Sequence, residues 1–487
     1  MQQGTKLDEA KRKLLERYAR GDVKPAGLTS AGIAARPTGE PAPLSLAQEQ
    51  LWIQEQVAGE AVPHNESVTI KANGWLDEAV LKRSLSELIR RHEIWRTSYE
   101  TINGRPFQVV HPAPFEFPWR VVDLRSVTIL DRDAQLASIT SEAARQCFDL
   151  ERGPLLRAML IRLTDTDQRL FLFAHLSILD GVSVYQILPV ELAQLYESFS
   201  LGQTSPLPEL PIQYSDYAYW QRQWLKSDEP AKQFDYWREK LAEELPVANW
   251  PSRTRATRAE TYLGAIQSFA LSQSLTEALK QLSRNMSVTL FTVLVGCFST
   301  LLFLETHQVE IIVGTPSGGG RKRSEVRALL GYFLNPVALR VSFQGNPSFQ
   351  EILLRIQKVI AEAVSYDDVP IASLARALRP NAKIGSNPFF SIALSLQPQT
   401  PALKTGWHVT SMDVDSGGGA WGIYLAFLDS ADGLGGRVQY NPDLFDRGTI
   451  VQMLQSLQEL MDSIAANPGR TISALDSGQC RHAVHIS

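Results

Sequence analysis

Residues 169–181 read Arg-Leu-Phe-Leu-Phe-Ala-His-Leu-Ser-Ile-Leu-Asp-Gly, and this stretch is the most informative part of the chain. The run at 169–174 is almost entirely apolar, which predicts a β-strand that is covered on both faces. His175 follows where the strand meets a loop, a common place for functional side chains held by a rigid scaffold. Asp180 and Gly181 then form a turn signal. The stretch therefore predicts a buried strand that delivers a histidine to a loop closed by an Asp-Gly turn.

A helix is predicted directly after this turn, over residues 182–197, because apolar residues recur there at helical spacing. Pro189 lies inside the span, so the helix is either kinked at Pro189 or starts there. Taken alone, the stretch also fits a purely structural interpretation, with a buried histidine that bonds to backbone and an aspartate that caps the helix. The rest of the chain is needed to decide between structure and function.

The composition excludes several classes of function. The 487 residues are 44% hydrophobic and carry a formal net charge of −4, with no strongly basic segment that would bind nucleic acid. The longest apolar stretch, 288–304, is interrupted by threonine and serine and predicts a buried helix rather than a membrane span. The polar N-terminus lacks the apolar core of a signal peptide, so we expect a cytoplasmic protein that binds no membrane.

Metal and redox chemistry have no signature in the sequence. Cys147, Cys297 and Cys480 are odd in number and widely spaced, which argues against a disulfide framework and against a cysteine-rich metal site. No His-Glu-x-x-His or comparable spacing occurs, so we expect no catalytic metal. The glycine-rich segment 314–323 lacks the Lys-Ser/Thr ending of a phosphate-binding loop and is predicted to be a flexible basic loop.

Helical and strand patterns alternate irregularly along the chain, which indicates an α/β protein with two lobes and mixed or antiparallel sheets. We expect an N-terminal amphipathic helix and a Pro/Ala-rich linker over 1–43, a first lobe over 44–225, a second lobe over 226–475 and an unstructured tail over 476–487. The helix at the N-terminus is a docking element or the tail of an upstream segment, and the sequence does not choose between them. No strong sequence repeat relates the two lobes.

Several motifs in order along the chain resemble those of nonribosomal peptide synthetase condensation domains. Their active-site signature, His-His-x-x-x-Asp-Gly, is similar to His175-Leu176-Ser-Ile-Leu-Asp180-Gly181, with leucine in place of the second histidine. The further similar segments are Ser45-Leu-Ala-Gln-Glu-Gln-Leu-Trp52, Arg91-His-Glu-Ile-Trp-Arg-Thr97, Tyr214-Ser-Asp-Tyr-Ala-Tyr-Trp220, Gly331-Tyr-Phe-Leu-Asn335 with Arg340, Asn387-Pro-Phe389 and Tyr440-Asn441. The resemblance covers residues from about 44 to 475.

This resemblance implies two chloramphenicol-acetyltransferase-like lobes in a V-shaped pseudo-dimer, with the active site in a tunnel between them. Strands of the second lobe are implied to cross over and cover the tunnel. An acyl donor and an aminoacyl acceptor would enter as thioesters on the phosphopantetheine arms of an upstream and a downstream carrier protein. No intrinsic cofactor is implied, and we expect a monomer.

The resemblance also assigns roles to individual residues. His175 would be an orienting, partly structural residue, and Asp180 a structural residue paired with an arginine, for which Arg340 is our candidate. Gly181 permits a close backbone approach. Leu176 occupies the position of the catalytic histidine and cannot transfer a proton. Further structural or tunnel positions are Arg96, Ser183, Asn335 and Arg340.

Two classes of function remain open at this stage. Leu176 favours a condensation-like module that no longer elongates and instead gates or binds carrier-bound intermediates. The alternative is an active acyltransferase that forms an amide or ester by positioning its substrates, with help from His175. Altered chemistry such as dehydration or cyclisation is a third, less favoured option. The sequences at 64–70 and 180–185 resemble those of condensation domains that follow polyketide modules, which suggests a polyketide-type acyl donor.

Overall fold

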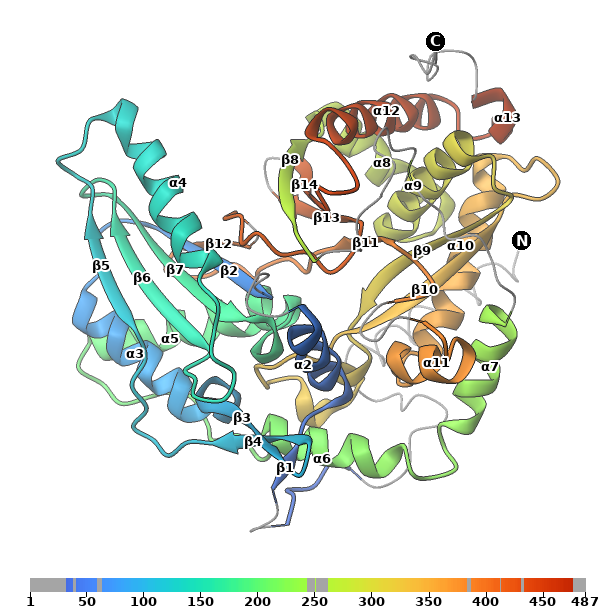
Figure 1. The fold of residues 1–487 in the computed structure, drawn as a ribbon. Helices are drawn as coiled ribbons and strands as arrows, with labels where there is room; N and C mark the ends of the chain where they lie inside the picture. The colour runs from blue at the N-terminus through green and yellow to red at the C-terminus, as the bar shows by residue number, and fades with distance from the viewer. Residues whose placement is uncertain are drawn as a thin grey trace, which may run out of the picture.

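The chain folds into two lobes, each with a β-sheet covered by helices, which lean against each other in a V (Figure 1). The prediction of two α/β lobes with mixed and antiparallel sheets is therefore confirmed. The computed structural model describes residues 32–37, 41–58, 64–242, 250, 262–382, 387–411, 413–430 and 433–475. The expected N-terminal helix, much of the linker and the expected tail lie outside these residues.

The first lobe contains a five-stranded sheet in the order β12-β2-β7-β6-β5. Its strands are β2 (Asn65–Asn73), β5 (Trp119–Asp123), β6 (Leu156–Arg162), β7 (Asp167–His175) and β12 (His408–Ser411). Leu170 and Leu172 of β7 join the main core of the lobe, whereas Phe171 and Phe173 pack in a second cluster on the other face. The strand that leads to His175 is thus covered on both faces, as its apolar run predicts.

Helices cover both faces of this sheet. Those of the first lobe are α3 (Glu78–Arg91), α4 (Ile129–Arg145) and α5 (Leu188–Ser200), with a short 3-10 helix η2 (Glu93–Arg96). The predicted helix after the Asp-Gly turn is a π-helical turn, η4 (Ser183–Ile187), followed by α5. Pro189 lies in the first turn of α5, directly after the π-helical turn, and the chain is already helical before it. Of the two alternatives, a start of the helix at Pro189 is therefore not observed, and the helix instead changes its hydrogen-bond pattern just before the proline.

A small three-stranded sheet in the order β1-β4-β3 lies below the first lobe in Figure 1. Its strands are β1 (Ala42–Pro43), β3 (Thr97–Ile102) and β4 (Arg105–Val110). Asn103 and Gly104 join β3 to β4, and both have positive φ, 52° and 76°. Two consecutive left-handed residues match the twist of a tight hairpin, a conformation that an Asn-Gly pair adopts readily.

The second lobe contains a six-stranded sheet in the order β10-β9-β11-β13-β14-β8. Its strands are β8 (Ala265–Ala270), β9 (Glu310–Ser317), β10 (Asn335–Ser342), β11 (Ile392–Leu396), β13 (Ile423–Ser430) and β14 (Gly433–Tyr440). The helices of this lobe are α8 (Gln273–Met286), α9 (Leu290–Thr306), α10 (Phe349–Ser365), α11 (Ile371–Leu378), α12 (Arg447–Ala466) and α13 (Ile472–Leu475). The apolar stretch at 288–304 becomes α9, which is buried between the sheet and its neighbouring helices.

Among the described residues, no single helix has the length and hydropathy of a membrane span. Helices α8 and α9 have this length and hydropathy only when the two are taken together, and the chain bends by 108° between the two helices.

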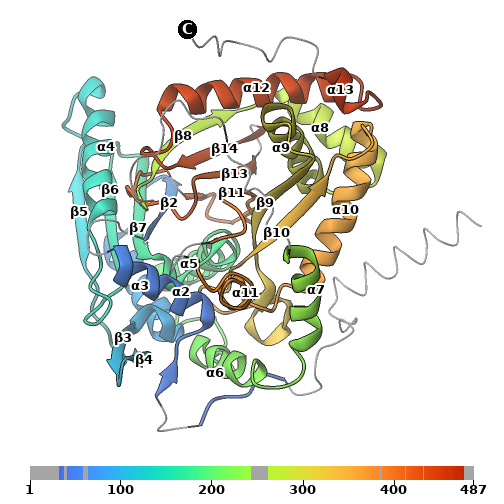
Figure 2. The ribbon, with the colours of Figure 1, turned by 45° about the vertical axis from the view of Figure 1, so that its right-hand side comes forward.

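Three further helices remain in the described part of the chain, and the last of them lies beside α10 and α11 of the second lobe (Figure 2). They are α2 (Leu46–Ala58), α6 (Tyr214–Trp224) and α7 (Ala231–Leu241). Helix α6 places Tyr214 and Tyr217 in the core of the first lobe and Trp224 in that of the second. Its aromatic sequence therefore fastens the two lobes together.

The second half of the chain also reaches into the first lobe. Strand β12 pairs antiparallel with β2, so His408 lies opposite Lys71. Two 3-10 helices, η5 (Gly319–Lys322) and η6 (Ser324–Val326), lead to Leu330 and Phe333, which are buried in the core of the first lobe. A strand of the second lobe thus crosses over, as the resemblance implied, and the lobes share more chain than a boundary at residue 226 suggests.

Candidate functional site

The end of β7 buries the motif histidine rather than presenting it. Antiparallel pairing with β2 places His175 opposite Asn65, and the side chain of His175 is 2% exposed. Its Nδ1 lies 2.7 Å from Oγ of Ser177, and its Nε2 lies 3.1 Å from Oε1 of Glu55. Burial lowers the pKa of His175, and the hydrogen bond to Glu55 opposes this only in part. His175 is thus a buried residue held by hydrogen bonds on both sides of its ring.

Glu55, from α2, holds a second histidine with the same oxygen. Nδ1 of His64, at the start of β2, lies 2.8 Å from Oε1 of Glu55. Burial alone would raise the pKa of Glu55, but the hydrogen bonds from His175 and His64 lower it to about 2. An ionised carboxylate therefore joins two imidazoles whose ring centroids lie 6.5 Å apart.

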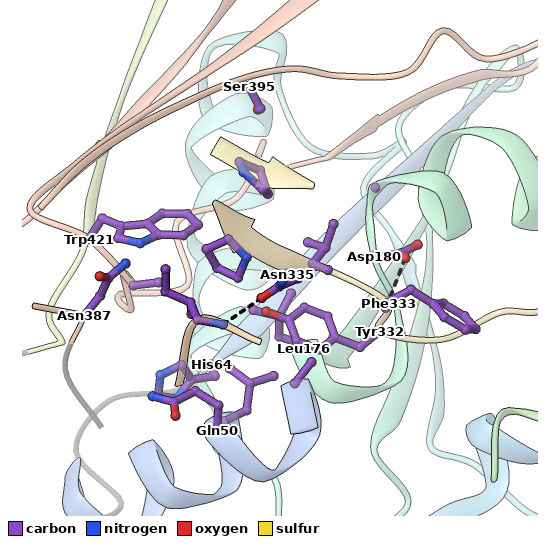
Figure 3. A pocket seen from close by; sticks show the side chains of 18 of the residues that line it. Gln50, His64, Leu176, Asp180, Tyr332, Phe333, Asn335, Asn387, Ser395 and Trp421 are labelled. Atoms are coloured by element: carbon purple, nitrogen blue, oxygen red, sulfur yellow. Dashed lines mark hydrogen bonds between the residues drawn. The ribbon is translucent and has the colours of Figure 1, made fainter. Parts of the chain in front are cut away.

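Asp180 is held by a buried arginine from the second half of the chain. Arg321 donates two hydrogen bonds of 2.8 Å to the two carboxylate oxygens of Asp180. The same guanidinium donates to Oγ of Ser183 at 2.8 Å, and the backbone N–H of Ser183 donates to Asp180. The backbone N–H of Phe333 donates to Asp180 as well, the bond drawn in Figure 3. Asp180 and Ser183 thus form a frame that locks the loop after β7 to residues 321–333.

Two expectations from the sequence are wrong here. Arg340 is not the partner of Asp180, because β10 runs away from the lobe junction and Arg340 pairs with Glu310 on β9 at 2.9 Å. Arg340 lies five positions beyond Asn335 along the strand, a rise of about 16 Å. Nor is 314–323 simply a flexible basic loop, since it contains the end of β9 and all of η5 and buries the side chain of Arg321, which is 7% exposed.

The remaining sequence candidates have different surroundings. Asn335 donates from Nδ2 to the carbonyls of Asp367 and Val369, at 2.7 and 2.8 Å, and accepts from the N–H of Ile371. It therefore fixes the chain that leads into α11. Arg96 donates to the carbonyl of His111 and to Glu93, on the far side of the first lobe. Arg96 is a structural residue of η2 and β4 rather than of the tunnel.

A cavity of about 450 Å³ lies where the lobes meet, and Figure 3 shows part of its wall. Both lobes line it, with His64, Leu176 and Asp180 from the first and Asn335, Asn387 and Trp421 from the second. Neither His175, Arg340 nor Arg96 is among the described residues that line the cavity.

Gly181 also lines the cavity, and a Cβ there would lie 3.0 Å from Oε1 of Gln397. A side chain at this position would crowd the opposite wall, as expected for a close backbone approach.

The sequence missed three residues that organise this site, namely Glu55, His64 and Arg321. No spacing links them to the motif, because they come from α2, from the residue before β2 and from η5, and reach the site only through the tertiary fold.

Comparisons with known proteins give a consistent result. A family model described as "Condensation domain" matches residues 39–481. A linear gramicidin synthase of Brevibacillus parabrevis is 37% identical over 441 residues, which is 90% of this chain and 9% of that protein. The chain thus spans less than a tenth of that relative's length.

Solved structures share the fold. The first condensation domain of the CDA synthetase superimposes with a TM-score of 0.79 at 17% identity, over 90% of this chain and 98% of that one. The X-domain from teicoplanin biosynthesis gives a TM-score of 0.77 at 22% identity, over 91% and 99% of the two chains. At these identities the likeness concerns the fold alone.

Proposed function

The chain belongs to the condensation-domain family, and from this premise we propose that it is an acyltransferase of a nonribosomal peptide assembly line. It takes an acyl donor and an aminoacyl acceptor, each as a thioester on the phosphopantetheine arm of a carrier protein. The amine of the acceptor attacks the thioester carbonyl of the donor, the C–S bond breaks, and an amide forms. The carrier proteins are its partners, and their arms supply the reactive thioesters.

The cavity between the lobes is the observation that carries this proposal. Its volume of about 450 Å³ is in the range of small-molecule sites, and it is large enough for the reacting ends of two substrates. The buried frame of Asp180, Arg321 and Ser183 fixes one wall of the cavity relative to the other. Holding two reactants in near-attack geometry lowers a barrier by up to roughly 7–11 kcal/mol. A rigid cavity of this kind supports catalysis by positioning.

A gate or binding module that does not elongate is the second candidate. Leu176 favours it, because this side chain lines the cavity at the position of the catalytic histidine of the family and carries no proton acceptor. The surroundings of His175 add support, since both of its ring nitrogens are engaged away from the cavity. On this view the cavity binds carrier-bound intermediates without joining them.

A single-turnover assay separates the two candidates. Wild-type protein is mixed with an acyl-loaded donor carrier and a glycyl-loaded acceptor carrier, and the carriers are read by intact-protein mass spectrometry. We expect the acyl group to move to the acceptor carrier as an amide. Binding of both carriers without any product, under conditions where Leu176→His forms product, would favour the gate. The same assay with a β-hydroxyacyl donor and an aminoacyl donor tests the polyketide-type donor.

A further inference from the structure

His64 brings an imidazole to the cavity wall beside the residue that interrupts the motif. The carbonyl of His64 accepts a hydrogen bond of 2.8 Å from the backbone N–H of Leu176, so the two residues are neighbours across the end of β2. Both line the cavity, and Figure 3 shows them close together. The ring of Tyr262, also a lining residue, lies 5.8 Å from that of His64. The imidazole of His64 is therefore part of the cavity wall.

The hydrogen bonds fix which nitrogen of each histidine carries the proton. Ser177 donates its backbone N–H to Nδ1 of His175, so this nitrogen accepts and Nε2 is the protonated one that donates to Glu55. Nδ1 of His64 faces a carboxylate, which is an acceptor, and therefore carries the proton of that ring. The free lone pair of His64 lies on Nε2, whereas His175 has none available.

Nε2 of His64 is buried and has no hydrogen-bond partner among the residues that the structure describes. The side chain is 4% exposed. A buried polar atom without a partner is costly, and such atoms need an explanation. A substrate that donates a hydrogen bond at the cavity wall would satisfy this nitrogen.

We propose that His64, held by Glu55, binds the acceptor amine through Nε2 and takes its proton, in place of the histidine that is Leu176 in this chain. This inference rests on the proposed amide formation. The amine nitrogen forms a bond to the thioester carbon and loses a proton to Nε2. As the C–S bond breaks, the leaving thiolate of the donor arm recovers this proton from His64. Glu55 is a positioning residue that fixes the tautomer and stabilises the imidazolium.

A structural role is the competing explanation for the Glu55–His64 pair. The pair joins α2 to β2, and it could serve this purpose without touching a substrate. A structural role, however, needs only Nδ1. That Nε2 has no partner among the described residues, in a residue that lines the cavity, is what distinguishes the two explanations.

The first test compares His64→Gln with the wild type in the single-turnover assay. General acid–base help contributes roughly 10²–10⁴-fold, so we expect the rate to fall by about a hundredfold or more. His408→Gln is the matched control, since His408 is exposed on β12 and does not line the cavity among the described residues. Its rate should equal that of the wild type.

For His64→Gly, added imidazole should restore part of the rate, which a structural role would not produce. An unchanged rate in His64→Gln would overturn the inference and leave the proposed function standing.

The second test does not depend on turnover. Protein labelled with ¹⁵N-histidine is titrated with an acceptor carrier whose glycyl group is attached through an amide in place of the thioester. We expect the Nε2 resonance of His64, assigned by its loss in His64→Gln, to shift on binding. A resonance that does not move while the carrier binds would overturn the inference. If the wild type forms no amide, the proposed function is wrong, and a shifted resonance still identifies His64 as the residue that binds the amine.

Discussion

The two ends of the motif after β7 differ in what surrounds them. At one end, Asp180 is fully buried and receives hydrogen bonds from Arg321, Ser183 and Phe333. At the other end, Leu176 lines the cavity beside His64, whose Nε2 has no partner among the described residues. The Asp180 end holds the lobes in register, whereas the Leu176 end faces the substrates. A motif divided in this way can keep its frame while the reactive group changes, because the frame does not depend on the side chain at position 176.

The largest effect is expected from breaking the frame. Arg321→Ala leaves the carboxylate of Asp180 buried without its partner, which should lower the free energy of unfolding by about 3–5 kcal/mol. Arg340→Ala is the matched control, because Arg340 also pairs with a carboxylate but is partly exposed. It should cost about 1 kcal/mol or less. Urea unfolding measures both. Equal losses in the two variants would contradict the view that the Asp180 end is the structural one.

His175→Ala tests whether His175 is a structural residue, like Asp180, or takes part in the reaction. Its ring bonds to Ser177 and Glu55 and is buried, so its loss should lower the free energy of unfolding by about 1–3 kcal/mol. The rate of the folded variant should fall by less than about tenfold, below the range of a general base. Thermal unfolding and the single-turnover assay provide the two readings. A rate loss as large as that of His64→Gln, with stability unchanged, would instead make His175 the base.

The frame and the reactive end were not equally predictable from sequence. The apolar run of β7 and the helical spacing after Asp180 are local, so they predicted the elements that carry the motif. The partner of Asp180 was not predictable in this way. Arg340 lies in a family motif but at the wrong end of β10, whereas Arg321 lies in a glycine-rich segment that gives no sign of being buried.

The same limit explains why Glu55 and His64 were missed. Their contact depends on where α2 lies between the lobes, and no sequence period encodes that position. His64 also stands just before β2, and nothing in the pattern of that strand marks it out. The sequence identified which loop matters, and the tertiary fold decided which side chains meet there.

Mild acidification should destabilise the protein through its buried histidines. Burial lowers the pKa of His175 and His92, so below about pH 6.5 the unfolded chain takes up protons that the folded chain resists. Stability is therefore greatest above this pH and is lost as the pH falls, by at most about 1.4 kcal/mol per pH unit for each histidine. Glu55 stays ionised in this window because its pKa is about 2. Urea unfolding at pH 7.0, 6.0 and 5.5 measures the slope, and His175→Ala should reduce it. If the free energy of unfolding changed with pH equally in the wild type and in His175→Ala, His175 would not be protected from protonation.

The smallest effect is expected from restoring the histidine of the family motif. Leu176→His adds an imidazole beside His64, but if His64 already takes the proton, the rate should rise by no more than about tenfold. The same substitution in a His64→Gln background should recover most of the lost rate, because the two side chains line the same part of the cavity. Leu176→Asn, which is polar but a poor base, is the control and should recover little. If Leu176→His instead raised the rate of the wild type by a hundredfold or more, position 176 would be the place where this chain lost its chemistry, and His64 would be a structural residue.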